Sequence, residues 1–391
     1  MEKIYFDHAA TTPVRPEVLD LMLPYYSEHY GNPSSIYEIA RSNKKAMELA
    51  REKTASALNA DPQEIFFTGS GTEADNWAIR GIAELNEKKG RHIITSAIEH
   101  HAVLHTCEYL GKHGFDITYL PVDEDGIIRM SDLESSIRPD TILITIMTAN
   151  NEIGSIQPIE KIGALAQSKG IAFHTDAVQA VGHIPINVKA QNIDLLSLSA
   201  HKLYGPKGVG VLYVRKGIPL RSFIFGGGQE RGRRAGTENI PGIVALGHAI
   251  ELSVSEMEEE SRRLTGLRSK LIDGILSSVP HTRLNGSRVN RLPNNVNVSF
   301  EFIEGESLLL LLDTKGIFAS SGSACTSGSL DPSHVLMAIG LPHEQAHGSL
   351  RLTLGRASTD SQAEYFLKEL PPIVSRLRDM SPLYEEYVKG Q

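Results

Sequence analysis

Between residues 64 and 212, short runs of apolar and β-branched residues alternate with longer amphipathic segments. Helical spacing covers residues 72–88, 102–112 and 159–169. The short runs lie at residues 65–67, 93–94, 142–147, 171–174 and 195–198. Strands that alternate with helices form right-handed crossovers in a mostly parallel sheet, which is covered by helices on both faces. The pattern therefore predicts an α/β fold with a doubly wound sheet.

The pattern changes on both sides of this region. Helical spacing precedes it at residues 35–58 and follows it at residues 241–278 as one or two helices. Strands and helices then mix, with strands expected at 297–302 and 350–354, and helices at 306–312 and 360–378, the last ending before Pro382. Such mixing predicts a smaller α+β domain. We expect a large domain at residues 13–255 and a small domain formed by residues 1–12 and 256–391.

Composition excludes several classes of protein. The 391 residues include 39 Lys and Arg against 47 Asp and Glu, so the net charge of −8 gives no general reason to bind nucleic acid or anionic lipid. The two cysteines cannot form a disulfide framework or a Cys-rich zinc site. Acidic residues interrupt the first residues before an apolar run develops, and the densest apolar run, residues 308–312, is far shorter than a membrane span. We expect a soluble cytoplasmic protein without a nucleic-acid or membrane partner.

A glycine-rich turn at residues 68–73 (TGSGTE) joins a predicted strand to a predicted helix. Backbone N–H groups at such a turn, together with the helix dipole, favour an anion and especially a phosphate group. An ordinary tight turn explains the same residues equally well. The turn matches neither a Walker A loop nor the GxGxxG fingerprint, which disfavours nucleotide and NAD binding.

Asp176 and Lys202 follow two neighbouring predicted strands. If those strands are parallel, both side chains emerge at the carboxyl edge of the sheet, where ligands bind in such folds. Taken alone, the two residues are better explained as a structural ion pair. A lysine that forms a Schiff base and an acid that keeps a pyridinium nitrogen protonated are, however, what a protein contributes to pyridoxal 5'-phosphate (PLP) chemistry. The glycine-rich turn would hold the phosphate.

Motifs along nearly the whole chain resemble the cysteine desulfurases of the NifS/IscS group, which are class V aminotransferases with the fold-type I PLP fold. The motifs are residues 7–13 (DHAATTP), 31–34 (GNPS), 99–103 (EHHAV), 150–154 (NNEIG), 175–179 (TDAVQ), 199–208 (SAHKLYGPKG), 234–237 (RAGT) and 321–327 (SGSACTS). Their number and order are much more specific than any single motif.

The resemblance implies a role for each matching residue. Lys202 would hold PLP covalently, Asp176 would bind the ring nitrogen, and Gln179 the phenolic oxygen. His100 would stack on the ring and act as a proton shuttle, with an imidazole pKa suited to neutral pH. The phosphate group would be bound by Gly71, Thr72, Ser199 and His201, with Thr237 reaching the cofactor of the other subunit in a homodimer. Asn151 and Arg351 would bind the substrate, Arg351 through the carboxylate.

Cys325 lies in residues 320–329, a stretch made only of small residues. A flexible linker is the ordinary explanation of that composition, but a long loop between elements of one domain is usually functional. The resemblance implies that Cys325 is the nucleophile that takes sulfur from L-cysteine as a persulfide. The only metal contact that we allow for is a transient one between Cys325 and an iron–sulfur cluster.

Three other features favour ordinary structural roles. Cys107 falls in an amphipathic segment and is expected to be a packed core thiol. Residues 231–234 (RGRR) are expected to form a solvated or interface loop. His101 and His105 are one helical turn apart, but no HExxH motif accompanies them, so we expect no resident metal.

The expected function is that of a PLP-dependent cysteine desulfurase, a sulfurtransferase that converts L-cysteine to L-alanine. It would supply sulfur to an acceptor protein, such as an iron–sulfur scaffold or a thiolation enzyme. Selenocysteine lyase and aminotransferase activities on the same fold remain alternatives, and only an aminotransferase would need a 2-oxo acid. A cofactor-free scaffold and an NAD enzyme are more distant alternatives.

Overall fold

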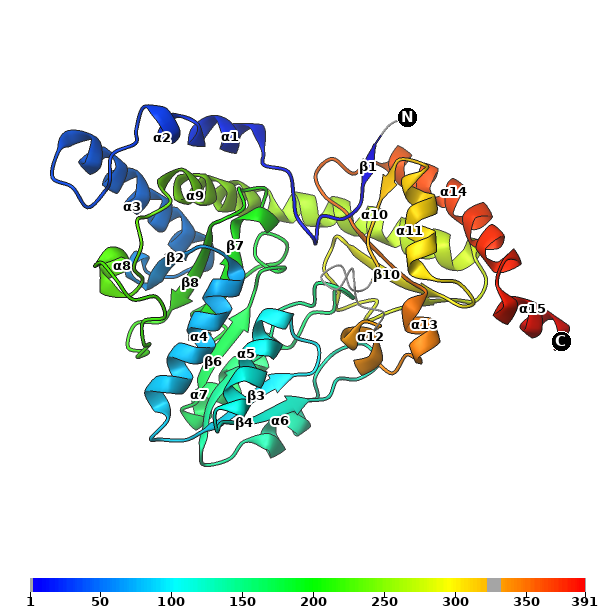
Figure 1. The fold of residues 1–391 in the computed structure, drawn as a ribbon, viewed down its shortest axis with the longest axis horizontal. Helices are drawn as coiled ribbons and strands as arrows, with labels where there is room; N and C mark the ends of the chain where they lie inside the picture. The colour runs from blue at the N-terminus through cyan, green and yellow to red at the C-terminus, as the bar shows by residue number, and fades with distance from the viewer. Residues whose placement is uncertain (1–2, 322–331, 391) are drawn as a thin grey trace.

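The computed structural model describes residues 3–321 and 332–390. Its centre is a seven-stranded sheet in the order β2-β8-β7-β6-β5-β3-β4 (Figure 1). The strands are β2 (Ile65–Thr68), β3 (His92–Ser96), β4 (Asp116–Leu120), β5 (Thr141–Thr145), β6 (Ala172–Asp176), β7 (Leu195–Ser199) and β8 (Gly210–Val214). The five strands from β7 to β4 are mutually parallel, and only β8 runs antiparallel to its neighbours β2 and β7. The predicted doubly wound, mostly parallel sheet is confirmed.

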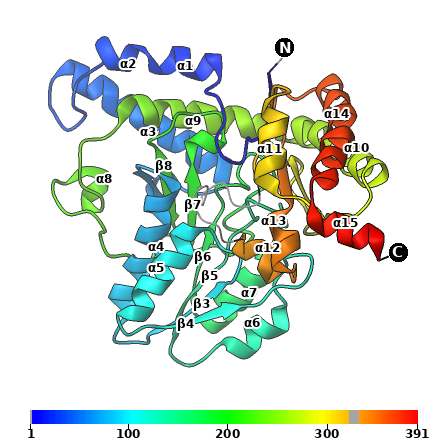
Figure 2. The same ribbon diagram turned by 45° about the vertical axis from the view of Figure 1, so that its right-hand side comes forward.

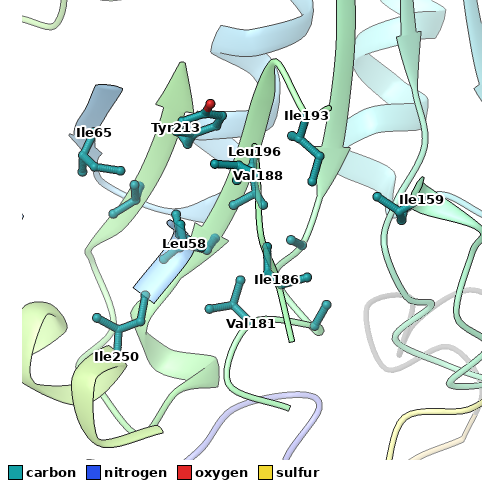
Figure 3. Close-up of a cluster of buried hydrophobic side chains, with 14 of the residues drawn as sticks. Leu58, Ile65, Ile159, Val181, Ile186, Val188, Ile193, Leu196, Tyr213 and Ile250 are labelled. Carbon is teal, nitrogen blue, oxygen red and sulfur yellow. The ribbon is translucent and has the colours of Figure 1, made fainter. Parts of the chain in front are cut away.

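Neighbouring residues of one strand enter the two hydrophobic cores on opposite faces of this sheet. Leu195 belongs to the core beneath α4 and α5, whereas Leu196 belongs to the core beneath α3, α7 and α9. Figure 3 shows part of the core beneath α3, α7 and α9, which includes Leu58, Leu196 and Ile250. Helices covering the sheet are α3 (Glu38–Leu58), α4 (Gly71–Asn86), α5 (His101–Lys112), α6 (Met130–Ser136), α7 (Ile159–Lys169) and α9 (Ile240–Ser255). The apolar runs of the strands are continuous because helices bury both faces of the sheet.

A separate core lies beyond the sheet, formed by side chains of residues 264–374 together with Ile4 and Phe6. Its three-stranded antiparallel sheet has the order β12-β10-β9, with β9 (Thr282–Leu284), β10 (Asn295–Phe300) and β12 (Ser349–Thr353). Figures 1 and 2 show α10 (Met257–Ser278), α11 (Gly305–Asp313) and α14 (Asp360–Asp379) gathered around it. The predicted domain boundary at residue 255 stays a prediction, and α9 ends at that residue.

The N-terminal chain joins both parts. Strand β1 (Ile4–Tyr5) pairs in parallel with β11 (Ile317–Phe318), and the chain then crosses to α1 (Pro16–Met22), which packs on α9 (Figure 1). The remaining short helices are α2 (Pro24–Ser27), η1 (Pro62–Glu64), η2 (Ala200–Lys202), α8 (Gln229–Gly232), α12 (His334–Ala338) and α13 (His343–His347).

The chain continues as a helix beyond the last one that the sequence predicts. Helix α15 (Pro382–Lys389) follows α14 directly. The expectation that the helix at 360–378 is the last one is therefore wrong. Pro382 stops one helix and starts another, because its fixed φ suits the first position of a helix. None of the helices in the described ranges combines the length and apolarity needed to span a membrane.

Candidate active site

Two parallel strands bring the predicted acid and lysine to one edge of the sheet. Strand β6 ends at Asp176, and η2, which follows β7, ends at Lys202. The carboxyl group of Asp176 accepts a hydrogen bond from the Val178 backbone at 2.9 Å. Burial raises its pKa to about 6, while the nearby positive charge of Lys202 acts in the opposite direction. A buried acid beside a lysine at this edge is the arrangement expected from the sequence.

An N-terminal segment runs past this edge, and we call residues 7–12 the strap. The ammonium of Lys202 donates to the backbone oxygens of Ala9 and Ala10, the second at 2.7 Å. Gln179 Nε2 donates to the same Ala9 oxygen at 3.0 Å. His201 Nδ1 lies 3.1 Å from the hydroxyl of Thr11. The strap thus connects three of the predicted cofactor-binding residues.

The glycine-rich turn opens α4 at the same edge. Ser70 caps the helix by accepting from Glu73 N at 3.1 Å, and Glu73 in turn accepts from Gly69 N at 2.8 Å. A Cβ atom on Gly71 would lie 2.7 Å from Val178 Cγ2 and 3.5 Å from Ser199 Cβ. Gly71 therefore allows the helix N-terminus to approach the ends of β6 and β7 closely. Thr72 lies exposed in the first helical turn, where backbone N–H groups lack intrahelical acceptors.

His100 is the N-cap of α5, and its Nδ1 accepts a hydrogen bond from Ala102 N at 3.1 Å. An accepting Nδ1 leaves the proton of the neutral ring on Nε2. Burial and the charge of Lys202 lower the pKa of His100 to about 4. The expected pKa near neutrality is therefore wrong, because the ring is removed from water and faces a cation.

Arg351 lies on β12 and is almost fully buried. Its Nη1 donates to the backbone oxygen of Asn151 at 3.2 Å, and its Nη2 donates to Asp7 Oδ1 at 2.8 Å. The structure thus brings the two predicted substrate residues together, with Asn151 contributing its carbonyl group to that contact.

Two predicted residues are not placed in this group. Thr237 lies exposed between α8 and α9. Cys325 lies outside the described residues. Just before residues 322–331, Ser320 exchanges backbone hydrogen bonds with Arg351. Just after them, the hydroxyl of Ser333 donates to the carboxylate of Glu152.

Sequence reasoning assigned no role to several residues of this region. Asp7 belongs to a motif that supports the resemblance, yet no chemistry was predicted for it. Asp75 on α4 is buried, and burial together with the charge of Asp176 raises its pKa well above the ordinary value. His174, two residues before Asp176 on β6, is buried between the hydroxyls of Thr145 and Ser197. Residues that are two positions apart on a strand face the same side of the sheet. This spacing is a signal that could have placed His174 near Asp176.

The features expected to be structural have these positions. Cys107 is fully buried in the core beneath α4 and α5, as expected, and burial raises its pKa to about 12. The rings of His101 and His105 lie 4.9 Å apart. Over residues 3–321 and 332–390, no three potential ligands are grouped for a metal ion. Arg234 forms an ion pair with Glu73, which ties residues 231–234 to the glycine-rich turn.

The residues at the sheet edge fit PLP. The buried carboxyl of Asp176 suits a pyridinium nitrogen, the amine of Lys202 suits the aldehyde, and the closely approached N-terminus of α4 suits the phosphate group.

The model of the aminotransferase class-V family matches residues 4–366. The chain belongs to this family. It is 61% identical to the cysteine desulfurase IscS of Methanosarcina thermophila, over 97% of this chain and 94% of that one. It is 58% identical to the cysteine desulfurase IscS of Clostridium botulinum (strain Hall), over 100% and 99% of the two chains. A solved NifS-like protein superposes with a TM-score of 0.91 at 42% identity, covering 96% of this chain and all of the other. Class V aminotransferases use PLP, in agreement with the residues found here.

Proposed function

We propose that this protein is a PLP-dependent cysteine desulfurase of the NifS/IscS group. The observation that carries the proposal is the position of Lys202 beside the buried Asp176, at the sheet edge that the N-terminus of α4 also reaches. The identity of 61% and 58% to two proteins named cysteine desulfurase supports it. A structural ion pair alone would not explain why the glycine-rich turn approaches the same edge so closely.

The proposed roles of the residues follow from their surroundings. Lys202 would hold PLP and, once released by the substrate amine, would accept the Cα proton at Nζ and return it. Bound PLP supplies an electron sink for the pair left at Cα. Asp176 would carry the negative charge opposite the ring nitrogen, and Gln179 would bind the phenolic oxygen. His100, neutral with its proton on Nε2, would stack on the ring and donate from that atom.

The remaining predicted residues divide between the phosphate group and the substrate. Gly71, Thr72, Ser199 and His201 would bind the phosphate group. Arg351 would bind the substrate carboxylate with the help of Asn151.

Sulfur transfer requires a nucleophile, for which we propose Cys325. Its thiolate would attack the sulfur of the substrate, so that the carbon–sulfur bond breaks and a sulfur–sulfur bond forms. The substrate carbon takes a proton, which gives L-alanine and a persulfide on Cys325. The other cysteine, Cys107, is buried with its pKa raised to about 12, so it holds its proton at neutral pH and does not compete.

We further propose that the protein acts as a homodimer, with Thr237 reaching the cofactor of the partner. Large apolar side chains that are exposed in one chain concentrate between residues 19 and 49: Leu19, Leu21, Leu23, Tyr26, Tyr30, Ile36, Tyr37, Ile39 and Leu49. A monomeric protein rarely exposes so much apolar surface in one segment. A second copy would cover it. Phe225, on the chain leading to Thr237, is another exposed aromatic side chain, at 76%.

The direct test incubates the purified holoenzyme with L-cysteine and no other thiol, and then measures alanine and protein-bound sulfur. We expect one added sulfur atom per subunit on the peptide with Cys325. Cys325→Ala should carry none, whereas the matched control Cys107→Ala should behave like the wild type. Failure of the wild-type holoenzyme to release alanine would overturn the proposal.

The same assay separates the alternatives. An aminotransferase would need an added 2-oxo acid for repeated turnover, and a selenocysteine lyase would act on L-selenocysteine and leave L-cysteine unchanged. The acceptor is proposed to be an iron–sulfur scaffold or a thiolation enzyme. Adding each class of acceptor to the persulfidated enzyme and measuring where the sulfur moves distinguishes them.

A further inference from the structure

Asp7 and Arg351 form an ion pair in the proposed substrate site, although 344 residues separate them in the chain. Arg351 Nη2 donates to Asp7 Oδ1 at 2.8 Å. The side chain of Arg351 is 2% exposed, whereas that of Asp7 is 19% exposed. Asp7 is therefore the more exposed partner of the pair.

The guanidinium retains the means to bind a second carboxylate. Its Nη1 donates to the Asn151 carbonyl, and its Nε is buried without a hydrogen-bond partner among the described residues. A buried donor that lacks a partner is costly, and an arginine fork binds both oxygens of a carboxylate when its donors are available. The unpaired Nε thus points to a carboxylate ligand on the same guanidinium that Asp7 engages.

The backbone of Asp7 is fixed beside Arg351, so only its side chain can turn away. Asp7 forms a parallel bridge to Thr353 on β12, and the next residue, His8, donates from its backbone to the Thr353 oxygen at 3.2 Å. The hydroxyl of Tyr5 donates to the backbone oxygen of Asp7 at 3.0 Å. The pairing is therefore built into the strap and does not depend on a mobile surface chain.

Glu152 is a second acid on which the charge of Arg351 acts. Burial raises the pKa of Glu152 to about 7, against the opposing effects of the Ser333 hydroxyl and of Arg351. A group with that pKa is partly protonated at neutral pH, so Glu152 balances the charge of Arg351 only in part. The ion pair with Asp7 supplies the direct counter-charge.

We propose that Asp7 is a positioning residue that sets carboxylate selectivity: its side chain and the α-carboxylate of the amino-acid substrate compete for the guanidinium of Arg351. This inference rests on the proposed function, which makes an amino acid the ligand. Asp7 neutralises a buried cation, and it lowers the affinity for every ligand that carries a carboxylate. Ligands without that group do not compete with it.

The test compares Asp7→Asn with the wild-type holoenzyme, using L-alanine and ethylamine as probes. The two probes differ only by the carboxyl group, and their binding is followed at equilibrium through the absorbance of the cofactor. Because Asn removes a negative charge close to the binding site, the Kd of L-alanine should fall about tenfold, while that of ethylamine stays unchanged. The KM for L-cysteine should fall in parallel without a rise in kcat.

Two further variants serve as a substitute and as a control in this test. Asp7→Ser removes the same charge with a smaller side chain and should show the same change in selectivity. It takes the place of Asp7→Asn if that variant folds poorly. Glu84→Gln removes a carboxylate from a partly exposed ion pair on α4 and should leave both affinities unchanged. An unchanged or raised Kd for L-alanine, or an equal shift for both probes, would overturn the proposal. Failure of the proposed function looks different, since the wild-type enzyme would then form no alanine from L-cysteine.

Discussion

The carboxylate of Glu73 accepts two hydrogen bonds from the guanidinium of Arg234, at 2.8 and 3.1 Å. The same carboxylate accepts from Gly69 N at 2.8 Å. One side chain thus fixes the glycine-rich turn and joins it to the loop that leads to Thr237. This contact links the proposed phosphate site of one subunit to the residue proposed to reach the other subunit.

Replacing Glu73 with Gln should weaken PLP binding. The variant loses a charge-assisted, two-pronged contact and a good acceptor for Gly69 N, so we expect the Kd of PLP to rise about tenfold. Titration of the cofactor-free protein with PLP measures this directly. Glu84→Gln, in the partly exposed ion pair with Arg80 on the same helix, is the matched control and should bind PLP like the wild type. An unchanged Kd in Glu73→Gln would show that the turn is ordered without this contact.

The α/β architecture could be predicted from the sequence because strands buried on both faces leave a plain apolar signal. Two strands of this sheet, β4 and β8, are absent from the predicted set, and the antiparallel direction of β8 is not encoded in that signal. The edge that carries Asp176 and Lys202 followed from the parallel arrangement of β6 and β7.

The finer features of the site depend on contacts between distant parts of the chain. Asp7 meets Arg351 only because β1 and the strap return beside β12. The low pKa of His100 depends on how deeply the ring is buried, which the EHHAV motif does not specify. Thr237 stays a prediction because its proposed contact belongs to another subunit.

Asp176→Asn should lower the rate of alanine formation by about 100-fold or more, a size typical of losing a charge at a reacting group. Asn retains the acceptor oxygen for Val178 N but cannot balance a protonated ring nitrogen. Because burial disfavours the charged acid, the variant should not melt at a lower temperature. The rate and the Tm are measured on the same preparations, with the exposed Asp116→Asn as control. A loss of rate that is matched by a loss of stability would contradict the electrostatic role.

Glu99→Gln should stabilise the protein increasingly as the pH rises. Burial raises the pKa of Glu99 to about 8, against the opposing hydrogen bonds from Ser96 and Met147. The unfolded chain releases this proton near the ordinary pKa of 4.5, whereas the folded chain keeps it until about 8. The contribution of Glu99 to the free energy of unfolding is therefore fully present below pH 4.5 and is lost as the pH approaches 8.

The measurement is the Tm of both proteins between pH 5 and 8. The difference in favour of the variant should grow over that range, since Gln has no proton to lose. A constant difference would mean that Glu99 does not keep its proton in the folded state.

His100 should stay neutral throughout the physiological range. With its pKa lowered to about 4, the imidazole signal of His100 in the NMR spectrum of the cofactor-free protein should not shift between pH 5.5 and 8. The signal is assigned by its loss in His100→Gln. A titration midpoint near 6.5 would show that the ring is more hydrated than its position at the N-cap of α5 indicates.

The central claim is that Lys202 holds PLP at the edge shared with Asp176, and borohydride reduction followed by peptide mass mapping tests it most directly. Reduction fixes the cofactor permanently to the amine that carries it. We expect the added mass on the peptide containing Lys202 in the wild type and in the exposed-site control Lys207→Ala, and no stable adduct in Lys202→Ala. Cofactor fixed to another lysine, or not fixed at all in the wild-type holoenzyme, would contradict the account.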